Sequence, residues 1–136
     1  MMDLYQKLKG LKLLLIDDDE WVRDSMRMFF ESEGCHILTL ETAEEGLHVL
    51  NKKNFDIIII DYRLPGLDGL EFLRRVQKRH PAAMKILITA YGSEKLFTEA
   101  RKLGVHEYIP KPFTSEAIEA SLNRLIENRD KDQVST

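Results

Sequence analysis

The chain has 136 residues, of which 32% are charged, and a net charge of -3 at pH 7. This length fits one domain with a core of its own, and the slightly negative charge gives no electrostatic attraction to nucleic acid or to an anionic membrane. A single cysteine excludes an internal disulfide, and no apolar stretch is long enough to cross a bilayer or to act as a signal peptide, which favours a cytoplasmic protein.

Four apolar segments end in polar residues, and they define the predicted sheet. Runs without polar alternation are typical of strands that are buried on both faces, and open α/β sheets bind ligands at the carboxyl ends of such strands. We therefore expect the four polar ends to meet in one crevice. In chain order the segments are Leu13–Ile16 before Asp17-Asp18-Asp19, Ile57–Ile60 before Asp61, Ile86–Ile88 before Thr89, and Tyr108-Ile109 before Pro110-Lys111-Pro112.

Five further segments have the apolar spacing of amphipathic helices. Gly34, His80-Pro81 and Gly104 are expected to end the first, third and fourth, while Thr42 with Glu45 predicts a capping box for the second. Strands that alternate with helices predict a mostly parallel sheet with right-handed crossovers and helices on both faces. The stripes are Val22-Met26-Phe29-Phe30, Ala43-Gly46-Leu47-Leu50, Gly69-Phe72-Leu73-Val76, Leu96-Ala100-Leu103 and Ile118-Ser121-Leu122-Leu125.

The polar ends also carry motifs that occur together in a known family. Four of them follow in order: Leu-Leu-Leu-Ile-Asp17-Asp18-Asp19, Asp61-Tyr-Arg-Leu-Pro65-Gly66-Leu-Asp68-Gly69, Ile-Thr89-Ala90 and Tyr108-Ile-Pro-Lys111-Pro112-Phe113. Each is weak alone, but the set resembles the receiver domain of response regulators in two-component signalling. The resemblance covers about residues 12–128. It implies an α/β fold with a five-stranded parallel sheet doubly wound by five helices, in the flavodoxin-like order 2-1-3-4-5.

By this resemblance, Asp61 is the phosphorylation site and attacks a phosphoryl group as a carboxylate nucleophile. Clustered carboxylates need a counter-charge, and Mg²⁺ favours oxygen ligands. The resemblance assigns Asp18 and Asp61 as direct Mg²⁺ ligands, Asp17 as a ligand acting mainly through water, and the backbone carbonyl of Arg63 as the remaining one. Lys111 is the catalytic partner of Asp61, because phosphoryl transfer depends mostly on positioning and charge neutralisation.

The remaining residues of the expected site bind the phosphoryl group and report its presence. The resemblance assigns Thr89 and Tyr108 as the switch pair, Ala90 as the small residue that leaves the site accessible, and Lys111 as the ammonium that meets the phosphoryl oxygens. It also implies a cis peptide bond between Lys111 and Pro112. We expect Trp21, the only tryptophan, to border the metal site.

Each of these residues also has an ordinary structural explanation. Three aspartates after a strand are common helix caps, and we expect only that role for Asp19 and Glu20. Asp61 before Pro65 and Gly66 suits a turn, and an isolated Lys-Pro is usually a surface turn. Trp21 fits core packing, and Arg74, Arg75, Lys78 and Arg79 fit a solvated helix face.

Two other classes of protein share parts of the pattern. A haloacid-dehalogenase-type phosphatase also uses an aspartate at a strand end, but it leaves Asp61 and Lys111-Pro112 unexplained. A nucleotide- or flavin-binding module needs a glycine- or hydroxyl-rich phosphate loop after its first strand. The sequence has acidic residues there instead, which repel phosphate.

The favoured reading is a signalling phospho-switch that catalyses only its own phosphorylation and dephosphorylation. Its expected partners are a sensor histidine kinase or phosphotransfer protein and a downstream protein or missing output domain. A homodimer is a further option. We expect no direct binding to nucleic acid or to a membrane. The predicted organisation is an N-terminal extension (1–10), the receiver (11–128) and a polar tail (129–136). Residues 127–136 are expected to fray.

Overall fold

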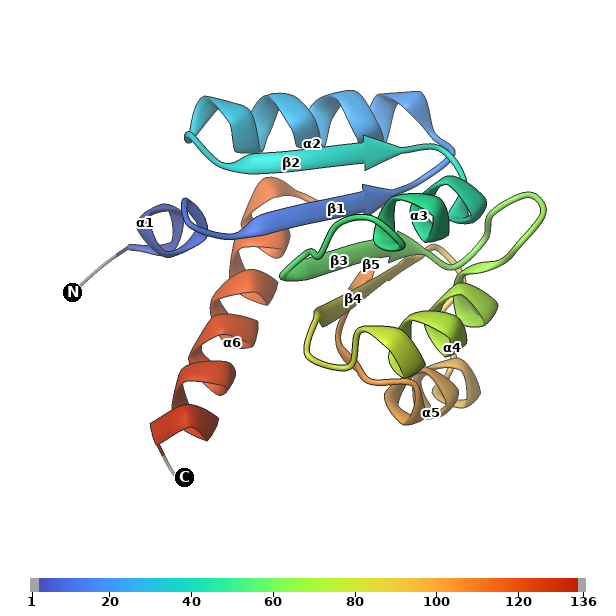
Figure 1. Cartoon of the computed structure of the whole chain (residues 1–136). Coiled ribbons are helices and arrows are strands. Elements are labelled where there is room, and N and C mark those ends of the chain that lie inside the picture. The colour runs from blue at the N-terminus through green and yellow to red at the C-terminus, as the bar shows by residue number, and fades with distance from the viewer. Residues whose placement is uncertain (1–2, 135–136) are drawn as a thin grey trace.

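The protein is described by a computed structural model in which residues 3–134 are placed. Five parallel strands lie in the order β2-β1-β3-β4-β5, as expected (Figure 1). Their bounds are β1 Lys12–Ile16, β2 His36–Leu40, β3 Ile57–Asp61, β4 Met84–Thr89 and β5 Val105–Pro110. No helix among the described residues is long and apolar enough to span a membrane.

Six helices surround this sheet. Five match the predicted segments, and the sixth, α1, lies in the predicted N-terminal extension. The bounds are α1 Leu4–Leu8, α2 Glu20–Ser32, α3 Ala43–Leu50, α4 Gly69–Arg79, α5 Glu94–Lys102 and α6 Ser115–Val134. The predicted boundaries hold locally: Thr42 and Glu45 form a capping box, α4 ends before His80, and Gly34 and Gly104 adopt the positive φ that follows a helix end.

The two faces of the sheet carry separate apolar clusters. On one face, Leu13 and Leu15 pack with side chains of α1, α2 and α6. On the other, Leu14 and Ile16 pack with side chains of α3, α4 and α5. Because successive side chains of a strand point to opposite faces, uninterrupted apolar strands supply both clusters at once.

Both ends of the chain differ from the sequence-based expectation. Leu4 and Leu8 of α1 are buried in the same cluster as Leu122 and Ile126 of α6. The predicted fraying from Glu127 is wrong for residues 127–134, because α6 continues through Val134; residues 135 and 136 lie outside the described part. Figure 1 shows α1 and the last turns of α6 on the side of the sheet away from the arrowheads of the strands.

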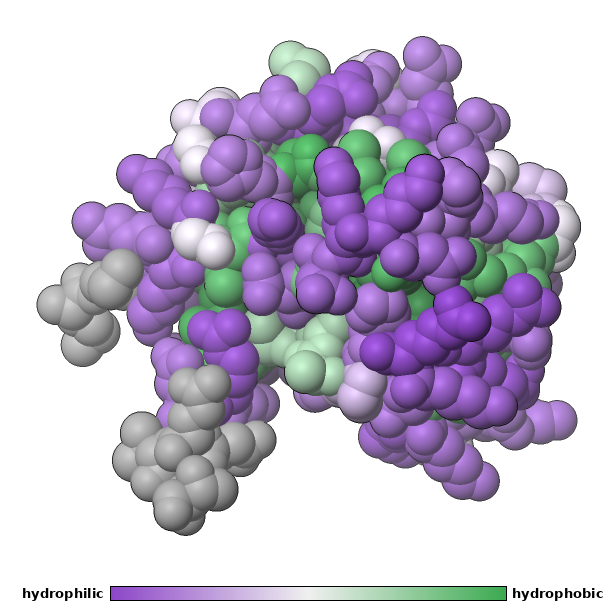
Figure 2. Space-filling model, viewed as in Figure 1, coloured by the Kyte–Doolittle hydropathy of each residue, from purple (hydrophilic) through white to green (hydrophobic). Residues whose placement is uncertain are grey.

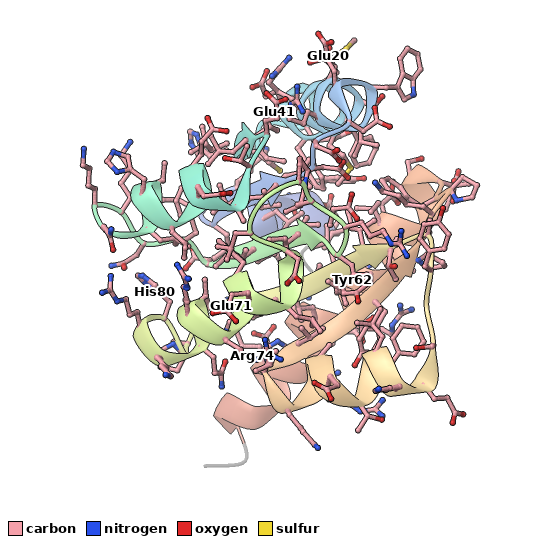
Figure 3. The ribbon with its side chains drawn as sticks, turned by 90° about the vertical axis from the view of Figure 1, so that its right-hand side faces the viewer. Glu20, Glu41, Tyr62, Glu71, Arg74 and His80 are labelled. Atoms are coloured by element: carbon pink, nitrogen blue, oxygen red, sulfur yellow. The ribbon has the colours of Figure 1, made fainter. Side chains whose placement is uncertain are left out.

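The outer surface of α4 is strongly hydrophilic (Figure 2). Arg74 lies 3.1 Å from Glu71 and 3.8 Å from Glu99, while Arg79 donates a 2.6 Å hydrogen bond to the side chain of Asn51. Figure 3 shows Glu71 and Arg74 on this helix. These contacts fit the expected solvated helix face, from which Arg74 also reaches α5 and Arg79 reaches the residue that follows α3.

Candidate functional site

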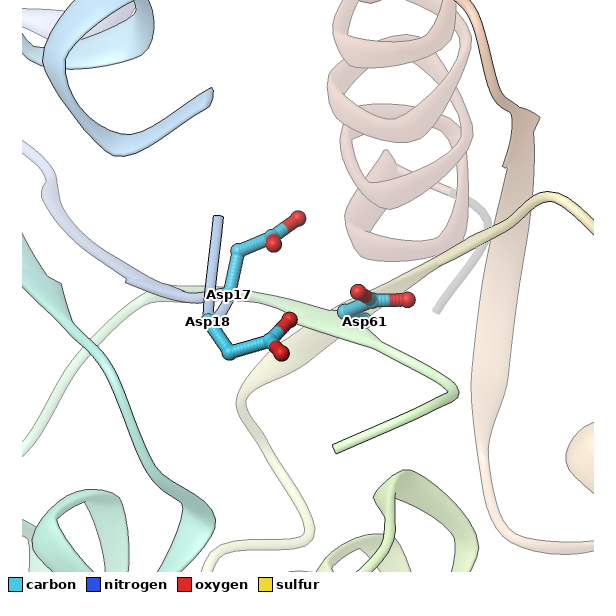
Figure 4. Close-up of side chains that lie close together, drawn as sticks. All are labelled: Asp17, Asp18 and Asp61. Carbon is cyan, nitrogen blue, oxygen red and sulfur yellow. The ribbon is translucent and has the colours of Figure 1, made fainter. Parts of the chain in front are cut away.

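Three carboxylates meet at the carboxyl ends of two neighbouring strands. Asp17 and Asp18 follow β1, and Asp61 is the last residue of β3; the register that pairs Ile16 with Ile60 brings these ends side by side. One oxygen from each carboxylate lies within 4.8 Å of the others (Figure 4). Asp17 is fully buried and Asp61 is 5% exposed, whereas Asp18 is exposed. The predicted acidic cluster is therefore present.

Lys111 supplies the positive charge of this cluster. Its ammonium Nζ lies 2.9 Å from Oδ2 of Asp17 and 2.9 Å from Oδ2 of Asp61, to which it donates a hydrogen bond. The peptide bond between Lys111 and Pro112 is cis, as the resemblance implies. The backbone N–H of Lys111 donates to the carbonyl of Thr89, which attaches the loop after β5 to the end of β4.

The charges in this pocket shift one another's pKa. Burial raises the pKa of Asp61, and the nearby Asp17 raises it further. The hydrogen bond from Lys111 lowers this pKa but offsets the increase only in part, so the pKa of Asp61 stays above its ordinary value. Burial lowers the pKa of Lys111, but the two carboxylates outweigh burial and leave that pKa above its ordinary value. With Asp18 included, three carboxylates share one ammonium, so the pocket has an excess of negative charge.

This donor set fits a hard divalent cation. Oδ2 of Asp17 is buried and accepts no hydrogen bond among the described residues, although the ammonium of Lys111 is near. Oδ1 of Asp17 accepts the N–H of Asp19 at 2.9 Å. One ammonium does not balance the charge of three carboxylates, and a divalent cation beside Asp18 and Asp61 would supply the missing positive charge. Oxygen ligands with one or two carboxylates are what Mg²⁺ prefers.

The loop after β3 holds the backbone of the site in place. The N–H of Arg63 donates to Oδ1 of Asp61 at 3.3 Å, which keeps the Arg63 backbone beside the acceptor. A Cβ on Gly69, the first residue of α4, would lie 2.6 Å from the carbonyl oxygen of Asp61. The helix therefore packs directly on the backbone of the acceptor residue, a contact that only glycine permits here.

The expected switch residues are placed differently from one another. Thr89 is buried at the end of β4, and its Oγ1 accepts the N–H of Tyr91 at 2.9 Å. Ala90 follows and is exposed beside Lys111 in a shared cavity wall. Tyr108 points to α5, where its hydroxyl donates to the carbonyl of Phe97 at 2.7 Å. Thr89 and Ala90 thus adjoin the charged cluster, whereas the ring of Tyr108 is held against a helix.

Three further side chains make contacts beside the site, and of these only Arg23 does not stand out in the sequence. Arg23 donates to the backbone carbonyl of Asp17 at 2.9 Å, and the guanidinium of Arg63 lies 4.3 Å from the centre of the Tyr91 ring. The spacing of α2 allows Arg23 to turn back to the start of the helix, but no motif predicts it. The Arg63 and Tyr91 contact joins two loops that are distant in sequence.

Two hollows open at the cluster. The first, of about 410 Å³, is lined by Asp18, Arg63 and neighbouring residues of the β3–α4 loop. The second, of about 430 Å³, shares Lys111 and Ala90 with the site and has Trp21 in its wall. Trp21 is 79% exposed, which rules out core packing, whereas its position beside the metal site stays a prediction. Asp19 caps α2 by accepting the N–H of Trp21, as expected.

The whole arrangement matches a known family. The sequence model of the response regulator receiver domain matches residues 13–123. The chain belongs to this family. Receiver domains are the phospho-accepting signalling domains of two-component systems, and use of Mg²⁺ is general among them. Family membership decides against the phosphatase and nucleotide-binding alternatives.

Similar proteins include longer regulators. The chain is 33% identical over 119 residues to the transcriptional regulatory protein GlrR of Escherichia coli, covering 88% of this chain and 27% of GlrR. It is 32% identical over 114 residues to the transcriptional regulatory protein FixJ of Bradyrhizobium diazoefficiens, covering 84% of this chain and 56% of FixJ. The chain thus spans between a quarter and about half of these relatives.

Solved structures of receiver domains share the fold. A CheY-like receiver domain from Methanospirillum hungatei superimposes with a TM-score of 0.84 at 28% identity, covering 90% of this chain and 98% of that one. A receiver domain from Clostridium thermocellum gives a TM-score of 0.79 at 29% identity, covering 88% of this chain and 97% of that one.

Proposed function

We propose that Asp61 of this receiver accepts a phosphoryl group from the phosphohistidine of a sensor histidine kinase or phosphotransfer protein. The observation that carries the proposal is the ammonium of Lys111, 2.9 Å from both Asp17 and Asp61. A buried acceptor carboxylate beside a fixed cation provides both the nucleophile and a charge for the incoming phosphoryl oxygens. A carboxylate that serves only a turn needs neither.

The transfer requires few protein groups. An oxygen of Asp61 forms the new bond to phosphorus while the bond between phosphorus and the donor nitrogen breaks, and the donor imidazole leaves with that electron pair. The ionised carboxylate attacks directly, so no general base is needed. The backbone N–H of Arg63 holds Oδ1 of Asp61. The ammonium of Lys111, which is bonded to Oδ2 of Asp61, is positioned to contact the phosphoryl oxygens once they are attached.

The proposed metal ligands are Asp17, Asp18, Asp61 and the backbone carbonyl of Arg63, with Asp17 acting mainly through water. When bound, Mg²⁺ neutralises charge on the phosphoryl oxygens and on the carboxylates. The ammonium of Lys111, in the loop after β5, provides a further positive charge for the phosphoryl oxygens, and the hydroxyl of Thr89 offers a hydrogen-bond donor. Ala90 leaves space for the phosphoryl group because it has no side chain beyond Cβ.

Phosphorylation is proposed to switch a distant face. Thr89 and Lys111 end β4 and begin the loop after β5, so movement toward the phosphoryl group acts on α5, β5 and α6. Loss of the phosphoryl group by hydrolysis within the same site completes the cycle, with no other substrate turned over. The phosphorylated face acts on a downstream protein or on a further domain. A homodimer of the receiver is a further option. The receiver boundaries at residues 11 and 128 and the cytoplasmic location stay predictions.

Incubation with acetyl phosphate and Mg²⁺ tests the acceptor. Mass spectrometry should detect one acid-stable, base-labile phosphoryl group on Asp61. Asp61→Ala should abolish labelling, and Asp18→Ala should suppress it through loss of the metal. Asp24→Asn is the matched control, because Asp24 pairs with Arg27 on α2 outside the cluster, and it should label normally. Equal labelling in excess chelator, or on another residue, would contradict the proposal.

A further inference from the structure

The cavity beside Lys111 has a different character from the charged cluster. Besides Lys111 and Asp19, its walls are mostly apolar and include the rings of Trp21 and Phe113. Its volume of about 430 Å³ lies within the range of small-molecule pockets, and such pockets are typically apolar with few polar groups. The full lining is Asp19, Trp21, Val22, Ser25, Ala90, Lys111, Pro112 and Phe113.

Trp21 is the unusual wall residue. Its side chain is 79% exposed, although exposure of an indole leaves a large apolar area in water. The helix does not need it for packing, since Met26 and Phe30 are the buried side chains of α2. An exposed ring at a cavity mouth next to a reactive centre is suited to stack on a ligand group.

The cavity and the phosphoryl site share a boundary. Lys111 lies 2.9 Å from the acceptor Asp61 and also lines the cavity, as does Ala90. A phosphoryl group held by the ammonium would therefore lie next to this cavity. The carboxylate of Asp19 accepts the N–H of Trp21 at the start of α2, so its charge is held at the helix N-terminus rather than directed at a ligand.

We propose that this cavity binds the organic group of a small acyl phosphate, so that the receiver accepts phosphate preferentially from donors with an apolar, aromatic acyl group. The inference rests on the proposed function of Asp61. The oxygen of Asp61 bonds to phosphorus, the bond from phosphorus to the acyl oxygen breaks, and a free carboxylate leaves with that electron pair. No proton, oxidant or further reactant is required.

The size of the expected preference follows from the burial of one ring. Extra apolar atoms of a substrate in a matching pocket change kcat/KM by roughly tenfold or more. Trp21 and Phe113 both line the cavity, so an aromatic acyl group can make more apolar contact there than the methyl group of acetyl phosphate. Trp21 then acts as a residue that determines donor specificity, whereas Asp61 and Lys111 act on the phosphoryl group of every donor.

The test compares phosphorylation of Asp61 by benzoyl phosphate and by acetyl phosphate in the presence of Mg²⁺. The ratio of the two kcat/KM values should be about tenfold higher in the unmodified protein than in Trp21→Ala, and Trp21→Phe should keep most of it. Because the ratio is compared between variants, the different intrinsic reactivities of the donors cancel. Benzoyl phosphate should also quench the fluorescence of Trp21, the only tryptophan.

Met28→Ala is the matched control. Met28 is a large apolar side chain of the same helix, 70% exposed, and it does not line the cavity. This variant should keep the ratio of the unmodified protein. A ratio that Trp21→Ala leaves unchanged would overturn the inference while labelling by acetyl phosphate still supports Asp61 as acceptor.

Two further outcomes are equally decisive. If Trp21→Ala slows transfer only from a protein phosphohistidine and leaves the acyl ratio unchanged, the cavity serves a protein donor and the inference is overturned. If neither acyl phosphate labels Asp61, this inference is overturned, while labelling of Asp61 by a protein phosphohistidine would still support the proposed function. A lower ratio in Trp21→Ala with unchanged behaviour of Met28→Ala supports the cavity as the acyl site.

Discussion

The ammonium of Lys111 donates a 2.9 Å hydrogen bond to Oδ2 of Asp61 across the ends of two strands that are not neighbours. β4 lies between β3 and β5, so the lysine reaches the acceptor past the end of that strand. This bond ties the position of the loop after β5 to the charge on Asp61. A chemical change at the acceptor must therefore alter the forces on that loop.

Replacement of Lys111 by Ala should have two effects. Two buried carboxylates lose their cation, which should lower the free energy of unfolding without Mg²⁺ by about 3 kcal/mol. The variant should still accept phosphate, though more slowly, and should fail to shift the face formed by α5, β5 and α6. Urea denaturation measures the first effect, and backbone chemical shifts before and after phosphorylation measure the second.

Lys102→Ala is the control for Lys111→Ala, because Lys102 is an exposed cation on α5 outside the cluster. It should change stability by less than about 0.5 kcal/mol. Chemical-shift changes in Lys111→Ala that match those of the unmodified protein would show that another group couples the site to the distant face.

Asp61→Asn should stabilise the metal-free protein at neutral pH. Burial and the nearby Asp17 raise the pKa of Asp61 above its unfolded value, so ionised Asp61 costs stability above the folded pKa. The cost shrinks as the pH falls toward the ordinary pKa of about 3.9. We expect a gain on the order of 1 kcal/mol at pH 7, or about 4 °C in Tm, that diminishes on acidification. Thermal unfolding from pH 4 to pH 8 measures it.

Addition of Mg²⁺ provides the control for this pH dependence. The cation stabilises ionised Asp61 in the unmodified protein. It should therefore reduce the difference in Tm between the unmodified protein and Asp61→Asn. A variant that is less stable than the unmodified protein at pH 7 without metal would contradict the described balance of charges.

Gly69→Ala should displace the backbone of the acceptor Asp61. The new methyl group would meet the Asp61 carbonyl oxygen at 2.6 Å and the Tyr62 Cα at 3.0 Å, so that backbone must move. Overpacking of this kind costs about 1–3 kcal/mol, and the shift of Asp61 should slow its phosphorylation by about tenfold or more. Gly10→Ala is the control, because no atom lies within 4 Å of its added Cβ. Normal labelling of Gly69→Ala would show that the backbone there is more adaptable than described.

Leu8→Ala should test the packing of α1. Leu8 is fully buried in the cluster formed with α2 and α6, so its truncation should cost about 2–5 kcal/mol in urea denaturation. Phosphorylation of the folded variant should stay unchanged, since α1 precedes β1 at the end opposite to Asp17. The exposed Lys9 provides the control Lys9→Ala, and equal stability of both variants would mean that α1 contributes little to folding.

The sheet and its acidic crevice could be predicted because local patterns determine them. Ile57–Ile60 is apolar at every position, as a strand buried on both faces requires, and Asp61 follows where parallel strands gather their ligands. Lys111 needs more than local pattern, because only the order of the strands brings it to Asp61. The resemblance supplied that order, and the structure confirms it.

Features that depend on contacts between distant segments could not be predicted. Five residues of α1 are too few for a periodic pattern, and its burial depends on packing with α6. The motif includes Gly69, but the sequence does not reveal that this residue packs against the backbone of Asp61. The 79% exposure of Trp21 does not follow from the pattern either, since a residue at the edge of an apolar stripe fits both the core and the surface.

The contact between Arg63 and Tyr91 connects the loop after β3 to the β4–α5 loop, and a hydrogen bond ties Tyr91 in turn to Thr89 at the end of β4. Oγ1 of Thr89 accepts the N–H of Tyr91, so the hydroxyl hydrogen stays free to be donated elsewhere. A side chain that turns toward a new acceptor pulls the backbone of Tyr91, and the ring of Tyr91 carries the guanidinium of Arg63. A rotation of the Thr89 side chain toward a phosphoryl oxygen would therefore be transmitted both to the β4–α5 loop and to the loop after β3, the two loops that border Asp61.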